Sequence, residues 1–211
     1  MKTDKLIDAL VADHTPRGKP LRWALAAALL AGGFVSFVLF FAALGVRADI
    51  EPALGTWRFD LKVALVLLAL GLAFSLCIAS SRPVMTNHPG RRLLPLAVLA
   101  AGAVAIELVV LPGTTWASRL VGSNALVCLV AIPTLAIAPL AAVLAILRLG
   151  APASPALAGG AAGLLAAAAA AALYTFHCFD DSPLFVVTWY ALAALPVIAL
   201  GAVAGHWLLR W

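Results

Sequence analysis

The residues best suited to chemistry lie in one short polar segment from His177 to Pro183, which reads His-Cys-Phe-Asp-Asp-Ser-Pro between two long apolar runs. Thiol, imidazole and carboxylate groups together suit a soft or borderline metal ion. Two thiols can instead form a disulfide when their Cα atoms come within about 7 Å. The candidate metal ligands are Cys128, Cys178, His177 and Asp180. The sequence leaves the choice between these two chemistries open.

Long apolar helices must position this segment, because the composition excludes a soluble protein. Of the 211 residues, 64% are hydrophobic and 11% are charged, whereas soluble domains are about 45–50% apolar and about 25% charged. A helix of roughly 20 apolar residues crosses the bilayer core. Six such runs are present, at 22–46, 61–80, 93–111, 122–147, 155–176 and 184–209. We therefore predict an all-α membrane protein, with a polar segment at 1–20 and a six-helix transmembrane domain at 21–211.

Lysine and arginine predict the orientation of these spans. With six spans, both chain ends share one side with the second and fourth loops, and this side carries ten of the 14 basic residues. Basic residues concentrate on the cytoplasmic side of a membrane. We therefore expect both termini in the cytoplasm of a bacterium, the protein in the inner membrane, and the 177–183 segment facing outward.

This topology brings residues from other spans towards the 177–183 segment. Glu107 lies near the outer end of the third span, while Asn124 and Cys128 lie one turn apart near the start of the fourth. A carboxyl group within a span normally marks a functional or structural polar contact. The other residues have plainer interpretations. Cys128 can be a small apolar filler. Asp180 and Asp181 can be solvated charges or caps for the last helix, with Pro183 starting that helix.

The N-terminal segment predicts a short docking helix. Thr3 or Asp4 can cap it, and four apolar side chains then fall on one face, at Leu6, Ile7, Leu10 and Val11. A helix this short is marginal alone in water, so it needs a partner groove or the membrane surface. Its three aspartates argue against anionic lipid as the main target. A topogenic tail without a partner is the alternative.

Glycines and prolines predict how the later spans pack. Gly159 and Gly163 are four residues apart in the fifth span, as are Gly201 and Gly205 in the sixth. Small residues at this spacing let helix backbones approach closely, so we expect these two spans to form an antiparallel pair. Two prolines inside the fourth span predict a kink there.

The chain opens on MKTDKLIDAL at 1–10, contains GSNALVC at 122–128 followed by Ile132-Pro133, has HC at 177–178 and DSPLF at 181–185, and ends on LLRW at 208–211. These stretches resemble the NrsF-type membrane anti-sigma factors, and the similarity runs through nearly the whole chain. The resemblance implies six spans and negative regulation of an extracytoplasmic-function (ECF) sigma factor. It also implies that Cys128 and Cys178 correspond to the family's paired cysteines, which are linked to stress sensing.

Together these inferences predict a membrane anti-sigma factor that releases its sigma factor on an envelope-side oxidant or thiophilic metal. The residues expected to bind the sigma factor are Thr3, Asp4, Leu6, Ile7, Leu10 and Val11. The residues expected to sense the signal are Cys128, Cys178, His177, Glu107 and Asn124. The expected partners are the sigma factor and the lipid bilayer, with no resident cofactor and no catalytic activity.

Two other functions fit part of the pattern. A small transporter or metal-handling protein would use Glu107 and the outer thiols, but no line of polar residues continues through the midplane of several spans. A thiol oxidoreductase is weaker, because the three cysteines show no CxxC spacing. The sequence contains no basic stripe with interleaved aromatic residues, so it does not predict a nucleic-acid-binding surface. The identity of the sigma factor, the inducing signal, the mode of release and the oligomeric state stay open.

Overall fold

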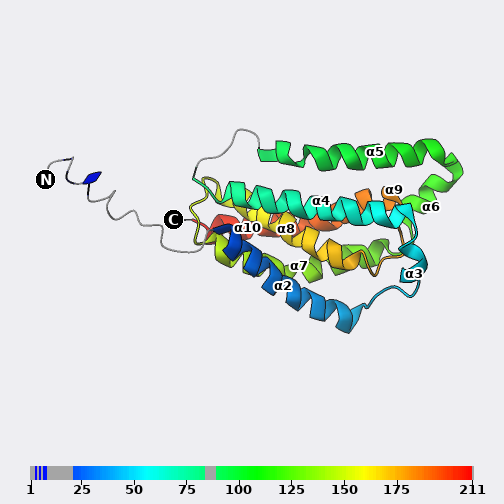
Figure 1. Ribbon diagram of the computed structural model, residues 1–211, viewed down its shortest axis with the longest axis horizontal. Helices are drawn as coiled ribbons and strands as arrows, with labels where there is room; N and C mark the ends of the chain where they lie inside the picture. The colour runs from blue at the N-terminus through cyan, green and yellow to red at the C-terminus, as the bar shows by residue number, and fades with distance from the viewer. Residues whose placement is uncertain (1–2, 4, 6, 9–20, 84–88, 211) are drawn as a thin grey trace.

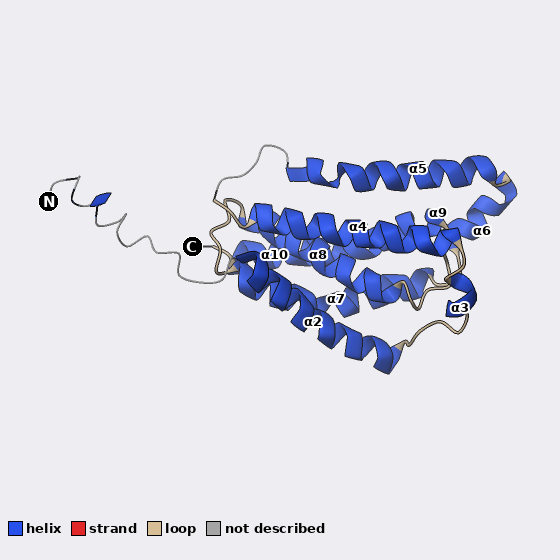
Figure 2. Ribbon diagram, viewed as in Figure 1, coloured by secondary structure: helices blue, strands red, loops and turns tan. Residues whose placement is uncertain are grey.

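The computed structural model describes residues 3, 5, 7, 8, 21–83 and 89–210, and every regular element in that part of the chain is a helix (Figures 1 and 2). Six segments of these residues are long and apolar enough to cross a membrane. The prediction of an all-α protein with six spans is therefore confirmed.

The spans are built on six long helices: α2 (Leu21–Ala43), α4 (Trp57–Ser80), α5 (Leu94–Val110), α7 (Ala125–Leu147), α8 (Pro155–Tyr174) and α10 (Ala191–Leu208). Short helical turns join or extend them: α3 (Ile50–Ala53), η1 (Pro89–Leu93), η2 (Gly113–Thr115), α6 (Trp116–Val121), α9 (Pro183–Phe185) and η3 (Val186–Tyr190). The last span therefore runs through α9, a π-helical turn at η3, and α10. The fourth long helix begins at Ala125 rather than at 122, because Gly122 ends α6 with a φ of 58°.

Helix α8 lies inside the bundle and packs against α4, α7 and α10, while α2 packs on α7 (Figure 1). Helix α5 lies at one edge and is the least buried of the six spans. The start of α2, the end of α4 and the end of α10 lie at one end of the bundle, which we name the terminal end. The connections at 44–56, 111–124 and 175–182 lie at the other, which we name the loop end. This grouping agrees with the predicted alternation of spans, and the membrane face of each end stays a prediction.

Helices α8 and α10 pack backbone against backbone, as the glycine spacing predicts. A Cβ added to Gly163 would lie 2.5 Å from the carbonyl oxygen of Val197. One added to Gly205 would lie 2.6 Å from the carbonyl oxygen of Pro155. Both distances are far below van der Waals contact, so only glycine permits this approach. The prediction that these two spans pair is confirmed.

A serine in α2 compensates for a proline in α7. Helix α7 continues through Pro139, which has no N–H and so leaves the carbonyl oxygen of Leu135 without its helical donor. The buried Ser36 hydroxyl donates to that oxygen at 2.6 Å. Gly32, one turn before Ser36, allows the approach, because a Cβ there would lie 2.5 Å from Pro139 Cα.

We expect Ser36→Ala to lower the free energy of unfolding by about 1 kcal/mol, because it leaves the Leu135 carbonyl oxygen buried without a donor. Unfolding in detergent micelles, followed by circular dichroism, measures this loss. Pro139→Ala restores an N–H to α7, so Ser36→Ala should cost less in that background. Equal losses in both backgrounds would show that the hydroxyl does not serve this carbonyl.

Candidate functional site

The connection between α8 and α9, residues 175–182, is the point where the other spans meet. Its hydrogen bonds reach the α2–α3 connection, α4, α5 and the turn before α7. Cys178 and Ser182 are both buried. The polar segment that the sequence singles out is therefore partly buried and bonded to the surrounding spans, rather than a fully solvated loop.

Two cations hold the backbone of this connection. Lys62 Nζ, in the second turn of α4, donates to the carbonyl oxygens of Cys178 (2.8 Å) and Asp180 (3.3 Å), and to the Asp181 carboxylate (2.9 Å). Arg47 Nη1 donates to the same Cys178 carbonyl (3.0 Å) and to both oxygens of Asp181 (3.0 and 2.9 Å). We name Arg47, Lys62, Asp181 and the Cys178 carbonyl group the clamp.

The two cations of the clamp are buried, and Asp181 and the neighbouring Asp49 balance their charges. Lys62 is 1% exposed and Arg47 is 6% exposed. Arg47 also pairs with Asp49 at 2.7 Å; this contact raises the pKa of the guanidinium above its usual value and lowers that of Asp49. The two cations thus face two carboxylates. A buried charge is strongly disfavoured unless it is paired, so each member of the clamp depends on the others.

Asp180 caps the start of α7 from a distant part of the chain. Its carboxylate accepts the backbone N–H groups of Asn124 (2.8 Å) and Ser123 (3.0 Å), and the side-chain amide of Asn124 (3.1 Å). A carboxylate is favourable here, because the first N–H groups of a helix lack partners and carry its positive end. Gly122 makes the room, since a Cβ there would lie 2.7 Å from Asp180 Cγ. Asp180 is thus neither a solvated charge nor a cap for the last span.

Glu107 binds the start of the last span instead. It is 2% exposed, and its Oε2 accepts the Ser182 hydroxyl (2.8 Å) and the Leu184 N–H (3.0 Å). Its Oε1 lies 3.7 Å from Arg119 Nη1. The last span begins at Pro183, as its sequence pattern predicts. Glu107 therefore ties α5 to α9, which is the kind of polar contact expected of a carboxyl group inside a span.

Cys128 and Cys178 lie in one buried core beneath the clamp, and both are free thiols. Burial raises the pKa of the Cys178 thiol, and the nearby Lys62 ammonium offsets only part of this effect. The thiolate is the nucleophile and the metal ligand. Cys178 is therefore protected while the connection stays closed.

The structure does not gather the predicted metal ligands into one group. His177 Nδ1 lies 3.0 Å from the carbonyl oxygen of Gly45 and so carries its proton on that nitrogen. The Asp180 carboxylate lies at the start of α7. Among the described residues, no three His, Cys, Asp or Glu side chains are placed to hold a metal ion. Metal binding by Cys128, Cys178, His177 and Asp180 therefore requires a different arrangement of this connection.

Sequence reasoning misses the two cations of the clamp as site residues. It uses lysine and arginine only to predict the orientation of the spans. Lys62 does carry a signal, since a lysine inside an apolar span is costly unless it has a partner. Arg47 carries none, because it lies among other charges in a polar connection. Its partner Asp181 is 134 residues away in the chain.

The predicted sigma-factor contact falls only partly within the described residues. Thr3 and Ile7 are described, and both are helical and exposed. The remaining predicted docking residues, Asp4, Leu6, Leu10 and Val11, lie outside the described part of the chain. Docking by this segment stays a prediction.

Comparison with known proteins gives full-length matches. A family model described as "NrsF: Negative regulator of sigma F" matches residues 10–211. The Anti-sigma-F factor NrsF of Caulobacter vibrioides is 36% identical over 220 aligned residues, which cover 100% of both chains. The Probable anti-sigma-F factor NrsF of Azospira oryzae is 36% identical over 225 aligned residues, again with complete coverage of both. No solved structure gives a significant match.

Proposed function

Since this chain belongs to the NrsF family of negative regulators of sigma F, we propose that it is an integral-membrane anti-sigma factor for an ECF sigma factor. The full-length similarity to two anti-sigma-F factors carries this proposal. The six membrane-length segments support a multi-pass membrane protein. In this proposal the protein lies in the inner membrane with both termini in the cytoplasm, where the sigma factor would be kept from RNA polymerase.

The N-terminal segment is the proposed sigma-factor contact. Its apolar residues fall on one face of a short helix, and a helix of this kind gains stability by laying that face in a partner's groove. The described residues Thr3 and Ile7 are helical and exposed, which leaves them free for such a contact.

A pull-down from native membranes tests the proposal, comparing the full chain with a chain that lacks residues 1–15. Bound soluble proteins are identified by mass spectrometry. We expect a sigma factor with the full chain and none with the truncated chain. Equal recovery from both chains would remove the N-terminal segment from the contact. Recovery from neither, with the sigma factor expressed, would overturn the anti-sigma proposal.

We further propose that Cys128 and Cys178 sense an oxidant or a thiophilic metal on the outer side. The supporting observation is that Lys62 and Arg47 hold the carbonyl group of Cys178 itself. A reaction at the buried sulfur needs the thiolate and more space, so it favours an arrangement in which the clamp is open. A signal shifts such an equilibrium only by binding one arrangement better than the other.

His177, Asn124 and Glu107 contribute to the proposed sensor by holding the same connection. The His177 ring contacts the α2 side, Asn124 receives the Asp180 cap before α7, and Glu107 reaches the connection from α5. Opening at Cys178 would therefore be felt by several spans at once, which is how a change at the loop end could weaken the grip on the sigma factor.

We expect Cys128→Ser and Cys178→Ser each to reduce induction by cadmium or a thiol oxidant to about the uninduced level, while repression stays intact. A reporter gene under a promoter that depends on the sigma factor measures both properties. Cys77→Ser is the matched control. Cys77 is also buried, but it lies near the end of α4 that is far from the clamp. Full induction in both outer variants would remove the thiols from sensing.

A further inference from the structure

The last span contains a π-helical turn, η3, next to the 175–182 connection. Within the described part of the chain this is the only π-helical segment. Such turns are rare inside α-helices and frequently lie at functional sites. The turn ends on Tyr190, which is buried in the same core as Cys128 and Cys178. A distortion of the helix thus places a tyrosine beside the two proposed sensor thiols.

The Tyr190 hydroxyl is buried and has no well-formed hydrogen bond among the described residues. The polar groups around it already have acceptors. Tyr174, whose ring centroid lies 5.9 Å from that of Tyr190, donates to the carbonyl oxygen of Asn124 at 3.5 Å. The Thr175 hydroxyl donates to the carbonyl oxygen of Ala171 at 2.8 Å. A buried hydroxyl without a partner is costly and calls for an explanation.

The Cys178 sulfur is the neighbouring atom that such a hydroxyl suits. In the closed connection the thiol donates to the carbonyl oxygen of Asp180 over 3.8 Å. Burial raises the pKa of Cys178, whereas the Lys62 ammonium, a backbone hydrogen bond at Asp180 and the Tyr190 hydroxyl each act to lower it. After the thiol loses its proton, the sulfur needs donors, and a carbonyl oxygen is no longer a suitable partner.

We propose that the Tyr190 hydroxyl activates Cys178 for the sensing reaction, by donating a hydrogen bond to the sulfur once the thiol has lost its proton. That proton passes to water at the opened loop end, while the hydroxyl keeps its own. The thiolate then forms its bond to a thiophilic metal ion. A hydrogen bond to the charged form of a group favours that form. The inference rests on the proposed sensor function of Cys178.

The other donors near this sulfur are already engaged. The ionisable groups around it are Lys62 of α4, Cys128 of α7, Tyr174 of α8, and His177, Asp180 and Asp181 of the connection. Lys62 holds two carbonyl oxygens and a carboxylate, and His177 donates to Gly45. Cys128 is only a weak donor. Tyr190 therefore supplies the uncommitted hydroxyl of this cluster.

Tyr190→Phe tests the proposal, because it keeps the ring and removes only the hydroxyl. The full-length chain, with Cys178 as its sole cysteine, is labelled with a maleimide in detergent micelles between pH 6 and pH 10. We expect the labelling rate at pH 7.5 to fall about tenfold and the midpoint of the pH–rate profile to move upward. The Tm should not fall, because the closed arrangement loses no well-formed hydrogen bond.

Tyr174→Phe is the matched control, since it removes a neighbouring hydroxyl that already donates to Asn124. It should leave the midpoint of the Cys178 pH–rate profile unchanged. An upward move of this midpoint in Tyr174→Phe but not in Tyr190→Phe would overturn the proposal. So would a lower Tm in Tyr190→Phe with unchanged labelling, because the hydroxyl would then serve the structure alone.

Induction by cadmium separates this inference from the sensor function on which it rests. Tyr190→Phe should require more cadmium for half-maximal induction of the reporter, with repression intact. If Cys178→Ser abolishes induction while Tyr190→Phe leaves both the labelling rate and the cadmium response unchanged, the sensor stands and the role of Tyr190 is overturned. If Cys178→Ser is fully induced, the sensor function fails, whatever Tyr190 does to the thiol.

Discussion

Replacing Asp181 by alanine is expected to lower the free energy of unfolding by about 3–5 kcal/mol, because it breaks a buried ion pair by removing one partner. Asp181 binds both Arg47 and Lys62. Arg47 keeps Asp49, but Lys62 keeps only carbonyl oxygens around a fully desolvated ammonium group. Equilibrium unfolding in mixed micelles, followed by circular dichroism, measures the loss.

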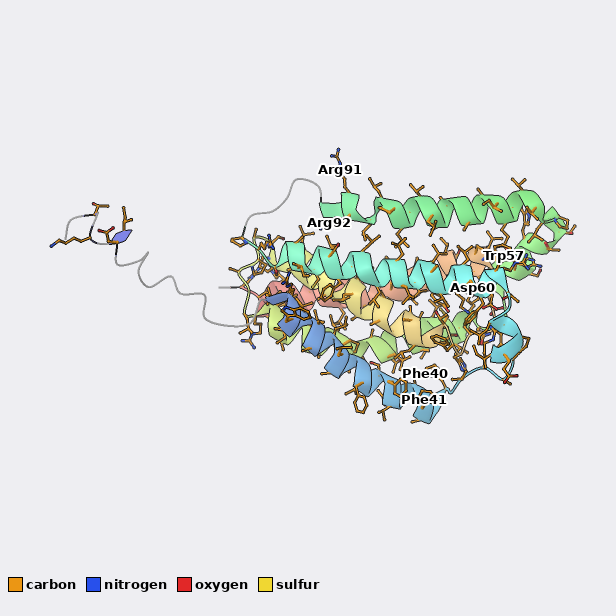
Figure 3. The ribbon with its side chains drawn as sticks, in the orientation of Figure 1. Phe40, Phe41, Trp57, Asp60, Arg91 and Arg92 are labelled. Carbon is orange, nitrogen blue, oxygen red and sulfur yellow. The ribbon has the colours of Figure 1, made fainter. Side chains whose placement is uncertain are left out.

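Two further variants define what the Asp181 result means. Asp60→Asn removes the same charge from an exposed residue in the first turn of α4 (Figure 3) and should change the stability by less than about 1 kcal/mol. Lys62→Met combined with Asp181→Ala should recover much of the loss, because an apolar replacement leaves no unpaired lysine. If Asp181→Ala were as mild as Asp60→Asn, the clamp would not hold the connection.

The same variant has a chemical readout at Cys178. In a chain whose other two cysteines are replaced by alanine, a membrane-permeant maleimide should label Cys178 slowly, because the thiol is buried and its pKa is raised. Asp181→Ala loosens the connection and should increase the labelling rate. An unchanged labelling rate alongside a large loss of stability would show that the clamp does not control access to the Cys178 thiol.

Gly159→Ala is expected to lower the free energy of unfolding by about 2–3 kcal/mol, because its new methyl group would overlap the backbone of α10. The Cβ would fall on the carbonyl oxygen of Gly201 and lie 2.7 Å from Gly205 Cα. Neither of these is the end of a flexible side chain, so α8 and α10 must separate. Thermal and chemical unfolding in one detergent give the change.

The next residue supplies a control of the same chemistry. A Cβ on Gly160 would meet only Ala202 Cβ at 3.7 Å and Ile198 Cγ2 at 3.9 Å, which is ordinary contact. Gly160→Ala should therefore stabilise the chain by about 0.5–1 kcal/mol through its higher helix propensity. Similar effects of the two substitutions would mean that α8 and α10 do not approach as closely as the structure shows.

The clamp lies at the loop end of the bundle, whereas α2, the first span after the proposed sigma-factor contact in the chain, begins at the terminal end. Helix α4 carries Lys62 near the loop end and runs for 24 residues to the terminal end, a length of about 36 Å. Coupling over this distance requires an element with two arrangements that both sites bias. Because the 175–182 connection joins several spans through buried bonds, it is the described element best placed to have two arrangements.

The sequence alone determined the parts of this protein that depend on local pattern. Long apolar runs predicted six spans, because backbone groups in lipid must be satisfied within a helix. Paired glycines predicted the α8–α10 contact, and Pro183 predicted the start of the last span. The polar 177–183 segment stood out because so few polar residues interrupt the apolar runs.

Only the tertiary structure decided which groups meet. Each span is apolar on nearly every face, so its periodicity does not show which side turns inward. The partners of Asp180, Asp181 and Ser36 lie 56, 134 and 99 residues away in the chain. Neighbouring aspartates with similar local sequence therefore take different roles, one capping α7 and the other closing the clamp. Their roles follow from the buried donors that the packed helices place beside them, and a linear pattern of residue types carries no record of that placement.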